Sequence, residues 1–410
     1  GVLVITGGPG TGKTTIIRCI LSLLKDDNDI LLCAPTGRAA KRMSEATGEE
    51  AKTIHRLLEY GGDSGAFARS EDYPLECDCL IVDEMSMVDV NLMRGLMRAV
   101  LPGTRVILVG DADQLPSVGA GNVLKDILDS DVVPSIRLTD IFRQDESSMI
   151  VLNAHRINHG EMPVLRSRDT DFFFTRKVLQ SEAAQAICDL LRSRLPKYLG
   201  FPKEEWQAQA TRCIQVLTPT KKGDCGAANL NRLLQETLNP ERPGVDSLLH
   251  GETEYRVGDK VIQTKNDYQI EYTRQTPFGP EEGAGVFNGD VGYIEHIDPA
   301  EHMMTVLFDD DRAVTYQKQQ LDALDLAYCL TVHKSQGSEF PVVVMPVVGG
   351  PPMLMARNLL YTALTRARQL VVLVGREEVI RQMVENDHVA KRYTTLKDRL
   401  LAAAQMGPEA

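Results

Sequence analysis

The chain has 410 residues, of which 43% are hydrophobic and 25% charged, so it is long enough to bury more than one hydrophobic core. No run of about 18 uninterrupted apolar residues occurs, and this composition excludes a disordered scaffold and a membrane span while predicting two or three globular domains. The formal net charge of −12 argues against a protein that coats nucleic acid with its entire surface, although it leaves room for a local basic groove.

Residues 1–150 alternate short apolar runs with amphipathic helical patterns. The runs that predict strands are Val2–Thr6, Ile30–Ala34, Leu80–Val82, Val106–Val109 and Ile136–Leu138. The patterns that predict helices are Thr14–Lys25, Arg38–Thr47 and Asn91–Ala99. This alternation indicates βαβ units around a parallel sheet. Because a buried strand begins at the second residue, we also expect that the natural protein carries a segment upstream of Gly1.

The βαβ pattern returns in the second half of the chain. Further strands are predicted at Cys213–Leu217, Ala327–Leu330, Val342–Met345 and Leu370–Val374. The sequence therefore predicts an α/β protein with two lobes and a cleft between them. We assign residues 1–133 to the first lobe, and residues 134–250 and 326–410 to the second.

A segment with a different sequence pattern separates the two parts of the second lobe. Residues 251–325 alternate polar and apolar side chains between glycines, which predicts a small inserted β-barrel. Within it, Gln269–Gly285 is polar and rich in Glu, Gly and Pro, and we expect a long exposed loop there. In the first lobe, turn-forming glycines in Gly61–Pro74 predict a hairpin that stands off the lobe, within an excursion over residues 59–76.

The cysteines are scattered along the chain and form no CxxC pair. Cys77 and Cys79 are the closest two, and strand alternation places them on one face. We therefore expect reduced structural thiols rather than zinc ligands or disulfides, as in a cytoplasmic protein.

A glycine-rich loop follows the first strand and opens the first helix. The segment Gly7–Thr14 has the spacing of a Walker A loop, in which glycines let backbone N–H groups turn around phosphate oxygens. Lys13 reaches the terminal phosphates, and Thr14 offers its hydroxyl to Mg²⁺. An incidental glycine-rich turn is the alternative, but the strand before the loop and the helix after it favour a phosphate site. We predict that a nucleoside triphosphate is held by Gly8, Pro9, Gly10, Thr11, Gly12, Lys13, Thr14 and Thr15.

Polar side chains stand at the ends of two later strands of the first lobe. Asp83 and Glu84 end the third strand, and behind a Walker A loop the first acid holds the metal while the second takes a proton from water. An acidic strand end by itself is as often a solvated cap. Gln114, in the segment Gly110–Pro116 after the fourth strand, can bond both the γ-phosphate and its attacking water. We therefore predict a metal ligand in Asp83, a general base in Glu84 and a sensor of nucleotide state in Gln114.

Several segments, in order along the chain, carry a further signal. They are Gly7–Thr14, Ala34–Ala40, Thr53–Leu58, Asp83–Glu84, Gly110–Pro116, Phe142–Gln144, Leu330–Glu339 and Tyr361–Ala367. Their order and spacing resemble the motifs of the RecD branch of superfamily 1 helicases, over nearly the whole chain. The resemblance implies two RecA-like lobes with an SH3-like barrel in the second, ATP and Mg²⁺ in the cleft, and single-stranded DNA across both lobes. It also implies a monomeric bacterial motor that moves from 5′ to 3′ and unwinds DNA at single-strand/duplex junctions in recombination and repair.

By position, the resemblance implies roles for individual residues. Arg143 and Arg366 correspond to arginine fingers that bring charge to the γ-phosphate, although the commoner role of an arginine is a surface ion pair. Gly337 and Glu339 correspond to the pair that touches the ribose and phosphates of the nucleotide. A lone histidine such as His55 is often a core or capping residue. DNA contacts are implied for Thr36, Arg38, Thr53, His55, Lys265, Asn266, Thr331, His333 and Lys334.

The hairpin in Gly61–Pro74 occupies the place of the family's pin, which splits the duplex as the motor advances. Phe67 is the candidate wedge, and an inert loop is the alternative. The family normally has an upstream glutamine-bearing stretch that recognises adenine and further N-terminal domains, and neither lies in this chain. The segment Gln269–Gly285 is longer than the family's usual barrel connection.

Other classes of function are open alternatives. A binding subunit that has lost its chemistry is disfavoured, because the expected catalytic residue types are all present. An RNA helicase of the same superfamily is separated from a DNA helicase only by the detailed resemblance. Some RecD-like proteins belong to a recombination nuclease complex, and since no carboxylate cluster is left over for two-metal cleavage, nuclease chemistry would belong to a partner protein.

Overall fold

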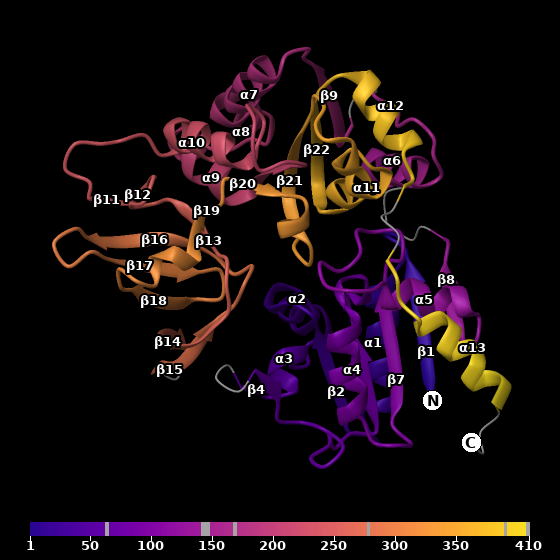
Figure 1. Cartoon of the computed structure of the whole chain (residues 1–410). Coiled ribbons are helices and arrows are strands. Elements are labelled where there is room, and N and C mark those ends of the chain that lie inside the picture. Colours follow the sequence, from indigo (N-terminus) through magenta and orange to yellow (C-terminus); the bar gives the residue numbers. More distant parts are fainter. Residues whose placement is uncertain (62–64, 141–147, 167–169, 277–278, 389–391, 407–410) are drawn as a thin grey trace.

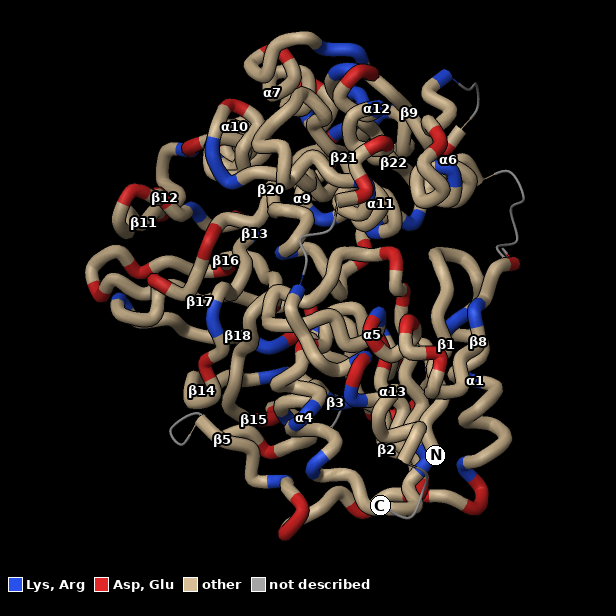
Figure 2. The backbone as a smooth tube through the Cα atoms, turned by 45° about the vertical axis from the view of Figure 1, so that its right-hand side comes forward, with Lys and Arg blue, Asp and Glu red and all other residues tan. Residues whose placement is uncertain are grey.

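The computed structural model describes residues 1–61, 65–140, 148–166, 170–276, 279–388 and 392–406. Two α/β lobes lie one above the other, and an antiparallel β domain lies at one side of both (Figure 1). The α/β class expected from the sequence is therefore confirmed. Lysines and arginines are interspersed with aspartates and glutamates over the lobes and the β domain (Figure 2), in keeping with the net charge of −12.

The first lobe is built on a six-stranded sheet in the order β3-β2-β6-β7-β1-β8, with every neighbouring pair parallel. Its strands are β1 (Val2–Gly7), β2 (Ile30–Ala34), β3 (Ala51–Thr53), β6 (Cys79–Val82), β7 (Arg105–Gly110) and β8 (Ser135–Leu138). They form from short aliphatic and β-branched runs that helices cover on both faces, so that β6, for example, is buried throughout. The strands predicted for this lobe are confirmed. The lobe boundary at residue 134 is wrong, because β8 pairs with β1 and so belongs to the first lobe.

Helices pack on both faces of this sheet. They are α1 (Lys13–Leu24), α2 (Gly37–Thr47), α3 (Ile54–Leu57), α4 (Val90–Ala99) and α5 (Val123–Ser130). Ile17 of α1 and Met43 of α2 belong to one core, whereas Leu96 of α4 and Ile127 of α5 belong to the core of the other face. Because the strands are parallel, the carboxyl ends of β1, β6 and β7 meet at one edge, which faces the second lobe (Figure 1).

The second lobe contains a five-stranded parallel sheet in the order β20-β10-β21-β22-β9. Its strands are β9 (Phe172–Arg176), β10 (Ile214–Thr218), β20 (Cys329–Thr331), β21 (Phe340–Val347) and β22 (Ala367–Gly375). Its helices are α6 (Met149–Asn158), α7 (Gln180–Asp189), α8 (Leu195–Tyr198), α9 (Trp206–Cys213), α10 (Ala227–Leu238), α11 (Arg357–Thr365) and α12 (Glu377–Glu385). Two hydrophobic cores again form the two faces of the sheet. The four predicted strands are confirmed, and β9 is an addition to them.

The inserted β domain is a seven-stranded sheet in the order β15-β14-β18-β17-β16-β13-β19, with all pairs antiparallel. Its strands are β13 (Lys260–Gln263), β14 (Asp267–Thr276), β15 (Gly279–Val286), β16 (Val291–Asp298), β17 (Met303–Phe308), β18 (Arg312–Tyr316) and β19 (Leu324–Leu326). A hairpin of β11 (Ser247–His250) and β12 (Thr253–Arg256) precedes it. The domain has a core of its own, as expected for an inserted barrel.

The expectation of a long loop at residues 269–285 is wrong. This segment forms most of the β14–β15 hairpin, whose strands pair from Asp267 with Val286 to Thr276 with Gly279. Most of its side chains are exposed, so its polar composition reflects a hairpin that projects into solvent rather than a lack of regular structure. Ile270 and Val286 are buried and anchor the base of the hairpin in the core of the β domain.

A short hairpin at residues 60–67 is present as predicted, with β4 (Tyr60–Gly61) paired to β5 (Ala66–Phe67). Phe67 does not project from it as a wedge. Its ring lies so close to Gly95 of α4 that a Cβ atom at Gly95 would approach it to 2.7 Å, and it packs against the core of the first lobe. Close packing on the lobe explains why the aromatic residue stands at this position.

The end of the chain crosses back to the first lobe. Helix α13 (Leu396–Met406) packs against α5, and Leu396 and Leu400 join the core of the first lobe. The assignment of residues 326–410 to the second lobe therefore has to be corrected for this helix, whose apolar positions continue a core that is remote in sequence. Among the described residues, no helix is long and apolar enough to cross a membrane.

Candidate functional site

The glycine-rich loop lies between β1 and α1 and is shaped around Lys13. Gly10 and Gly12 adopt left-handed conformations with φ of 74° and 84°, which glycine reaches without strain. The Lys13 ammonium donates hydrogen bonds to the carbonyls of Gly7 and Gly8, at 2.7 and 2.9 Å. No side chain caps the N-terminus of α1, so its first N–H groups are available to phosphate oxygens. The loop thus has the form of a phosphate cradle.

The second lobe contributes a polar atom above this cradle. His155 of α6 carries a buried Nε2 atom that has no hydrogen-bond partner among the described residues. A Cβ atom built on Gly8 would lie 3.7 Å from this nitrogen, so the histidine faces the loop across the cleft. A buried nitrogen that no described group contacts and a glycine-rich loop both fit a nucleotide in this position.

Asp83 and Glu84 follow β6 at the same edge of the sheet. Glu84 holds φ of 53°, a left-handed conformation that is uncommon for a residue with a side chain and concentrates at functional sites. Its N–H donates to Asp83 Oδ1 at 2.8 Å. Burial and the neighbouring charge of Glu84 raise the pKa of Asp83 to about 6. Burial acts in the same direction on Glu84, but the guanidinium groups of Arg366 and Arg42 outweigh it and hold its pKa below the usual range.

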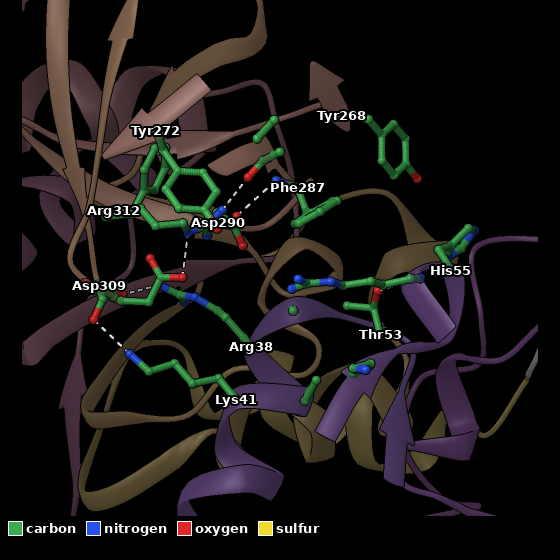
Figure 3. Close-up of a pocket in the computed structure, with 18 of the residues that line it drawn as sticks. Arg38, Lys41, Thr53, His55, Tyr268, Tyr272, Phe287, Asp290, Asp309 and Arg312 are labelled. Carbon is green, nitrogen blue, oxygen red and sulfur yellow. Dashed lines mark hydrogen bonds and ion pairs between the residues drawn. The ribbon is translucent and has the colours of Figure 1, made fainter. Parts of the chain in front are cut away.

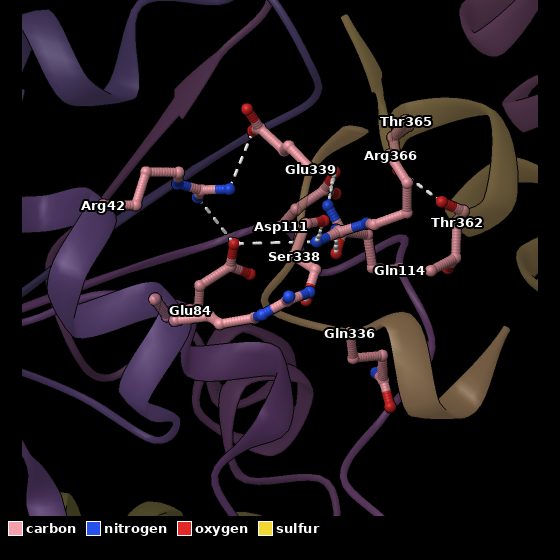
Figure 4. A network of polar contacts seen from close by, with 12 residues as sticks. Arg42, Glu84, Asp111, Gln114, Gln336, Ser338, Glu339, Thr362, Thr365 and Arg366 are labelled. Carbon is pink, nitrogen blue, oxygen red and sulfur yellow. Dashed lines mark hydrogen bonds and ion pairs between the residues drawn. The ribbon is translucent and has the colours of Figure 1, made fainter. Parts of the chain in front are cut away.

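Arg366 enters this site from the second lobe, as the resemblance implied (Figure 4). It follows α11, is 2% exposed, and has a buried Nε that finds no partner in the part of the chain that the structure describes. Its other nitrogens donate to Gln114 Oε1 and, at 3.2 Å, to the carbonyl of Ser338, and one lies 3.9 Å from Glu84 Oε1. The structure therefore brings together Glu84, Gln114 and Arg366 from distant parts of the chain. Arg143 lies outside the described residues.

Helix α11 also holds the segment that carries Gln114. The Tyr361 hydroxyl donates to Asp111 Oδ2 at 2.8 Å, and the N–H of Leu115 donates to the Thr362 hydroxyl at 2.9 Å. Gln336, from the segment after β20, donates to the carbonyl of Leu115 at 2.8 Å. These hydrogen bonds, with that from Arg366 to Gln114, join this segment of the first lobe to the second lobe.

Gly337 and Glu339 lie at the contact between the lobes. Gly337 has φ of 76°, and a Cβ atom there would approach the Thr36 hydroxyl of the first lobe to 2.5 Å. The carboxylate of Glu339 is bound by two arginines, Arg42 and Arg368, each at 2.8 Å. The contact of these two residues with a nucleotide stays a prediction.

A cavity of about 400 Å³ lies between the lobes on the side of the β domain. The predicted DNA-contacting residues that line it are Thr36, Arg38, His55, His333 and Lys334. Asn266 reaches the same place indirectly, because its side chain accepts a hydrogen bond from the N–H of Asn288, which lines the cavity. Of the remaining predicted contacts, Thr53 caps α3, and Thr331 lines a neighbouring pocket together with Lys334. Lys265 lies in the connection between β13 and β14, next to Asn266.

The cations of this cavity are paired with carboxylates. Arg38 contacts Asp309 of the β domain at 2.7 Å and the Ser338 hydroxyl at 3.0 Å. Lys334 contacts Asp325 at 2.9 Å. DNA phosphates at these cations would have to replace the carboxylates, which are 46% and 60% exposed and therefore weakly held.

His55 is partly packed among aromatic side chains and partly open to the inter-lobe cavity. Its ring packs against Tyr60 and Phe67, with centroids 5.5 and 5.8 Å apart, and also lines the cavity. Burial lowers its pKa, so the imidazole is neutral at pH 7. It can therefore bond to a phosphate or a base as a neutral group.

A second cavity, of about 440 Å³, adjoins the first, because Arg38 and His55 line both (Figure 3). It lies between helices α2 and α3 and the β domain. Aromatic rings bridge its two sides, since Tyr268 lies 5.8 Å from Tyr60 of the short hairpin and 5.6 Å from Phe287. The short hairpin and the β domain therefore meet beside the inter-lobe cavity.

Sequence reasoning left several site residues without a role. Asp111, Tyr361 and Thr362 lie within segments that resemble helicase motifs, yet their contact across the cleft has no local signature. Arg42 was also missed, although it follows Arg38 by four residues and therefore lies on the same face of α2. A search for charged pairs at helical spacing could have found it.

Three family descriptions match successive parts of the chain. They are an AAA domain over residues 1–120, an ATP-dependent RecD-like DNA helicase SH3 domain over residues 230–308 and a UvrD-like helicase C-terminal domain over residues 326–374. The second covers most of the inserted β domain, the third covers strands β20 to β22 of the second lobe, and the first covers the phosphate loop and the acidic strand end.

Two relatives are similar over most of the chain. An ATP-dependent RecD2 DNA helicase of Deinococcus radiodurans is 39% identical over 368 residues, which are 90% of this chain and 46% of that protein. The RecBCD enzyme subunit RecD of Mycolicibacterium smegmatis is 32% identical over 434 residues, with 98% of this chain and 73% of that protein covered. The chain thus spans about half the length of the first relative.

Solved structures share the fold at lower identity. The Pif1 helicase of Candida albicans has a TM-score of 0.53 at 18% identity, with 99% of this chain and 96% of that chain covered. The Bacteroides Pif1 helicase solved with ADP-AlF3 and single-stranded DNA has a TM-score of 0.52 at 19% identity, with 100% and 94% covered. The phosphate loop, the cleft and the two-lobe arrangement define the class as a P-loop fold of the helicase type. Within that class, the chain belongs to the RecD-like family of DNA helicases, so the resemblance read from its motifs is confirmed.

Proposed function

We propose that this chain is an ATP-driven motor that moves along single-stranded DNA from 5′ to 3′ and unwinds duplex DNA ahead of it. The observation that carries the proposal is the meeting of Arg366 from one lobe with Glu84 and Gln114 from the other, beside the phosphate loop. Such a site is complete only when the cleft is closed. Opening and closing of the cleft can therefore be driven by binding and hydrolysis of a nucleotide.

Each residue of the cleft then has a distinct task. The backbone of residues 8–15 and the Lys13 ammonium hold the phosphates of ATP. The Thr14 hydroxyl and the Asp83 carboxylate would hold Mg²⁺, which prefers oxygen donors and neutralises phosphate charge when bound. Glu84 takes a proton from the attacking water, and Gln114 orients that water. Arg366, together with Arg143, stabilises the charge on the transferred phosphoryl group.

The DNA path and the nucleotide site share one short segment. His333, Lys334 and Gln336 follow β20 and line the inter-lobe cavity, and Gln336 also donates to the carbonyl of Leu115. Leu115 directly follows Gln114. A strand bound in the cavity can therefore change the position of Gln114, which gives DNA a physical route to stimulate hydrolysis.

The predicted DNA contacts suit a motor that does not read sequence. Hydroxyls, a neutral imidazole and cations contact phosphates and sugars, and these contacts position a strand without distinguishing its bases. The aromatic contact of the short hairpin with the β domain supports a separating role for this region at a single-strand/duplex junction. We place the activity in DNA recombination and repair, where a nuclease complex would supply any cleavage chemistry.

The test is steady-state ATP hydrolysis with no nucleic acid, with single-stranded DNA and with single-stranded RNA of equal length, at one stated salt concentration. Strong stimulation by DNA alone is the expected result. Equal stimulation by RNA would contradict the assignment of DNA as the substrate, and no stimulation would favour a binding subunit. Lys13→Ala is the control, because it should abolish hydrolysis while salt-sensitive binding to single-stranded DNA remains.

A further inference from the structure

Five charged side chains form a chain across the cleft, with alternating sign. Arg366 lies 3.9 Å from Glu84, Glu84 lies 2.8 Å from Arg42, Arg42 lies 2.8 Å from Glu339, and Glu339 lies 2.8 Å from Arg368. Glu84 and Arg42 belong to the first lobe and the other three residues to the second (Figure 4). Arg42 is the middle member, and no role has yet been given to it.

Arg42 binds one carboxylate from each lobe with different nitrogens. One terminal nitrogen donates to Glu84 Oε1 and the other to Glu339 Oε1, both at 2.8 Å. A guanidinium is planar and rigid, so it fixes the separation and direction of the two carboxylates that it joins. A lysine ammonium, which is a single point of charge, does not impose this geometry. The Arg42 side chain is 24% exposed and Glu84 only 9%, so water screens the pair poorly.

Stability alone does not explain this arrangement. The free energy lost when paired charges leave water is about as large as the free energy gained from their attraction. Apolar side chains of similar size therefore often stabilise a fold equally well. The pair instead places a cation on the residue that accepts the proton from water. Both arginines that approach Glu84 do so at Oε1, and within the described part of the chain Oε2 accepts no hydrogen bond. Oε2 is therefore the oxygen that is left to meet a water molecule.

We propose that Arg42 is a positioning residue that orients Glu84 toward the attacking water only while Glu339 of the closed second lobe holds its other side. The inference rests on ATP hydrolysis in this cleft, as proposed above. Arg366 has to serve the transferred phosphoryl group, and Arg42 keeps Glu84 in place when it does so. In an open cleft Arg42 no longer contacts Glu339, so the guanidinium is not held in one orientation. Glu84 is then not oriented toward the attacking water, and ATP is hydrolysed only after the cleft closes.

The test compares Arg42→Ala, Arg42→Lys, Glu339→Gln and the double variant Arg42→Ala/Glu339→Gln in DNA-stimulated ATP hydrolysis. Misplacing a catalytic group costs about 10²-fold in rate, so Arg42→Ala should lower kcat by about that factor and leave KM for ATP within about threefold. Arg42→Lys should recover little of it. Because Arg42 acts through Glu339, the double variant should be little slower than Arg42→Ala, rather than show the product of both losses.

Arg98→Ala is the matched control, because it breaks an arginine–glutamate pair of 2.8 Å on the exposed surface of α4 and should leave kcat unchanged. The inference is wrong if Arg42→Ala keeps the kcat of the unmodified chain, if its loss lies in KM, or if the losses of the two single variants multiply. Should Arg42→Ala fail to fold, Glu339→Gln keeps the shape of its side chain and must still lower kcat. An unmodified chain that hydrolyses no ATP would instead overturn the proposed function itself.

Discussion

Lys260 of β13 is a buried cation at the junction of the β domain and the second lobe, and it allows a quantitative prediction. It is 3% exposed, and its ammonium donates to the carbonyl of Thr211 in α9 at 3.0 Å. Burial first, and the charge of Arg38 second, lower its pKa from 10.5 to about 8, whereas Asp309 and Cys213 act weakly in the opposite direction. The folded protein therefore binds this proton less tightly than the unfolded chain does.

The sign of the effect on stability follows from that difference. Between pH 8 and pH 10.5 the unfolded chain carries more protons at this site, so the free energy of unfolding rises with pH over this range. The lowered pKa corresponds to about 3 kcal/mol of destabilisation at pH 7. Lys260→Met removes this cost but leaves the Thr211 carbonyl without a partner, which costs about 1 kcal/mol. The substitution should therefore stabilise the protein by about 2 kcal/mol at pH 7.

The assay is urea unfolding followed by tryptophan fluorescence at pH 7 and pH 10. Trp206 is the single tryptophan and begins α9, the helix whose carbonyl Lys260 contacts, so the signal comes from the relevant region. The unmodified chain should gain more stability from pH 7 to pH 10 than Lys260→Met does. Lys318→Met, at an exposed position, controls for the loss of one charge. Equal pH dependence in both proteins, or a destabilised Lys260→Met at pH 7, would refute the reasoning.

Three further outcomes are expected. Arg366→Ala should leave binding of a fluorescent ATP analogue nearly intact and slow turnover by about 10³-fold, and a collapse of affinity with unchanged turnover would contradict a finger role. Gly337→Ala places a Cβ atom 2.5 Å from the Thr36 hydroxyl at a φ of 76°, so DNA-stimulated turnover should fall about tenfold, and unchanged turnover would show that this contact does not limit closure. Replacing residues 62–65 by Asn-Gly closes the short hairpin with a tight turn, and it should abolish strand separation in an unwinding assay while sparing ATP hydrolysis; retained unwinding would end the pin assignment.

The elements that the sequence predicts well are those with a local cause. The phosphate loop, Asp83 and Glu84 stand at strand ends, and in parallel strands these ends meet at one edge without further information. Buried strands of the two lobes are short aliphatic runs, and they are recognisable wherever helices cover both faces. Gln114 follows a strand end at the same edge, whereas Arg366 was predicted because the motif that contains it resembles that of a known family.

Two ion pairs that the sequence does not reveal have long-range causes. Arg38 looks like a free cation in the sequence, but Asp309 of the β domain neutralises it from 271 residues away. Arg42 likewise gains its partner Glu339 only when the two lobes meet. The β14–β15 hairpin was taken for a loop because its strands are stabilised by backbone pairing rather than by a buried apolar face. The hydrophobic content of a segment indicates whether it is buried, so it does not identify a strand whose side chains are exposed.

The return of α13 to the first lobe has a mechanical consequence. Because β1 and α13 both belong to the first lobe (Figure 1 and Figure 2), the second lobe is an insert that is tied to the first at two places. Two covalent ties limit how far the two lobes can separate. Arg392 fastens one tie by donating to the carbonyls of Gly119 and Gly121, at 2.7 and 2.8 Å. A probe attached to α13 would therefore stay with the first lobe, whereas a probe on α12 would stay with the second.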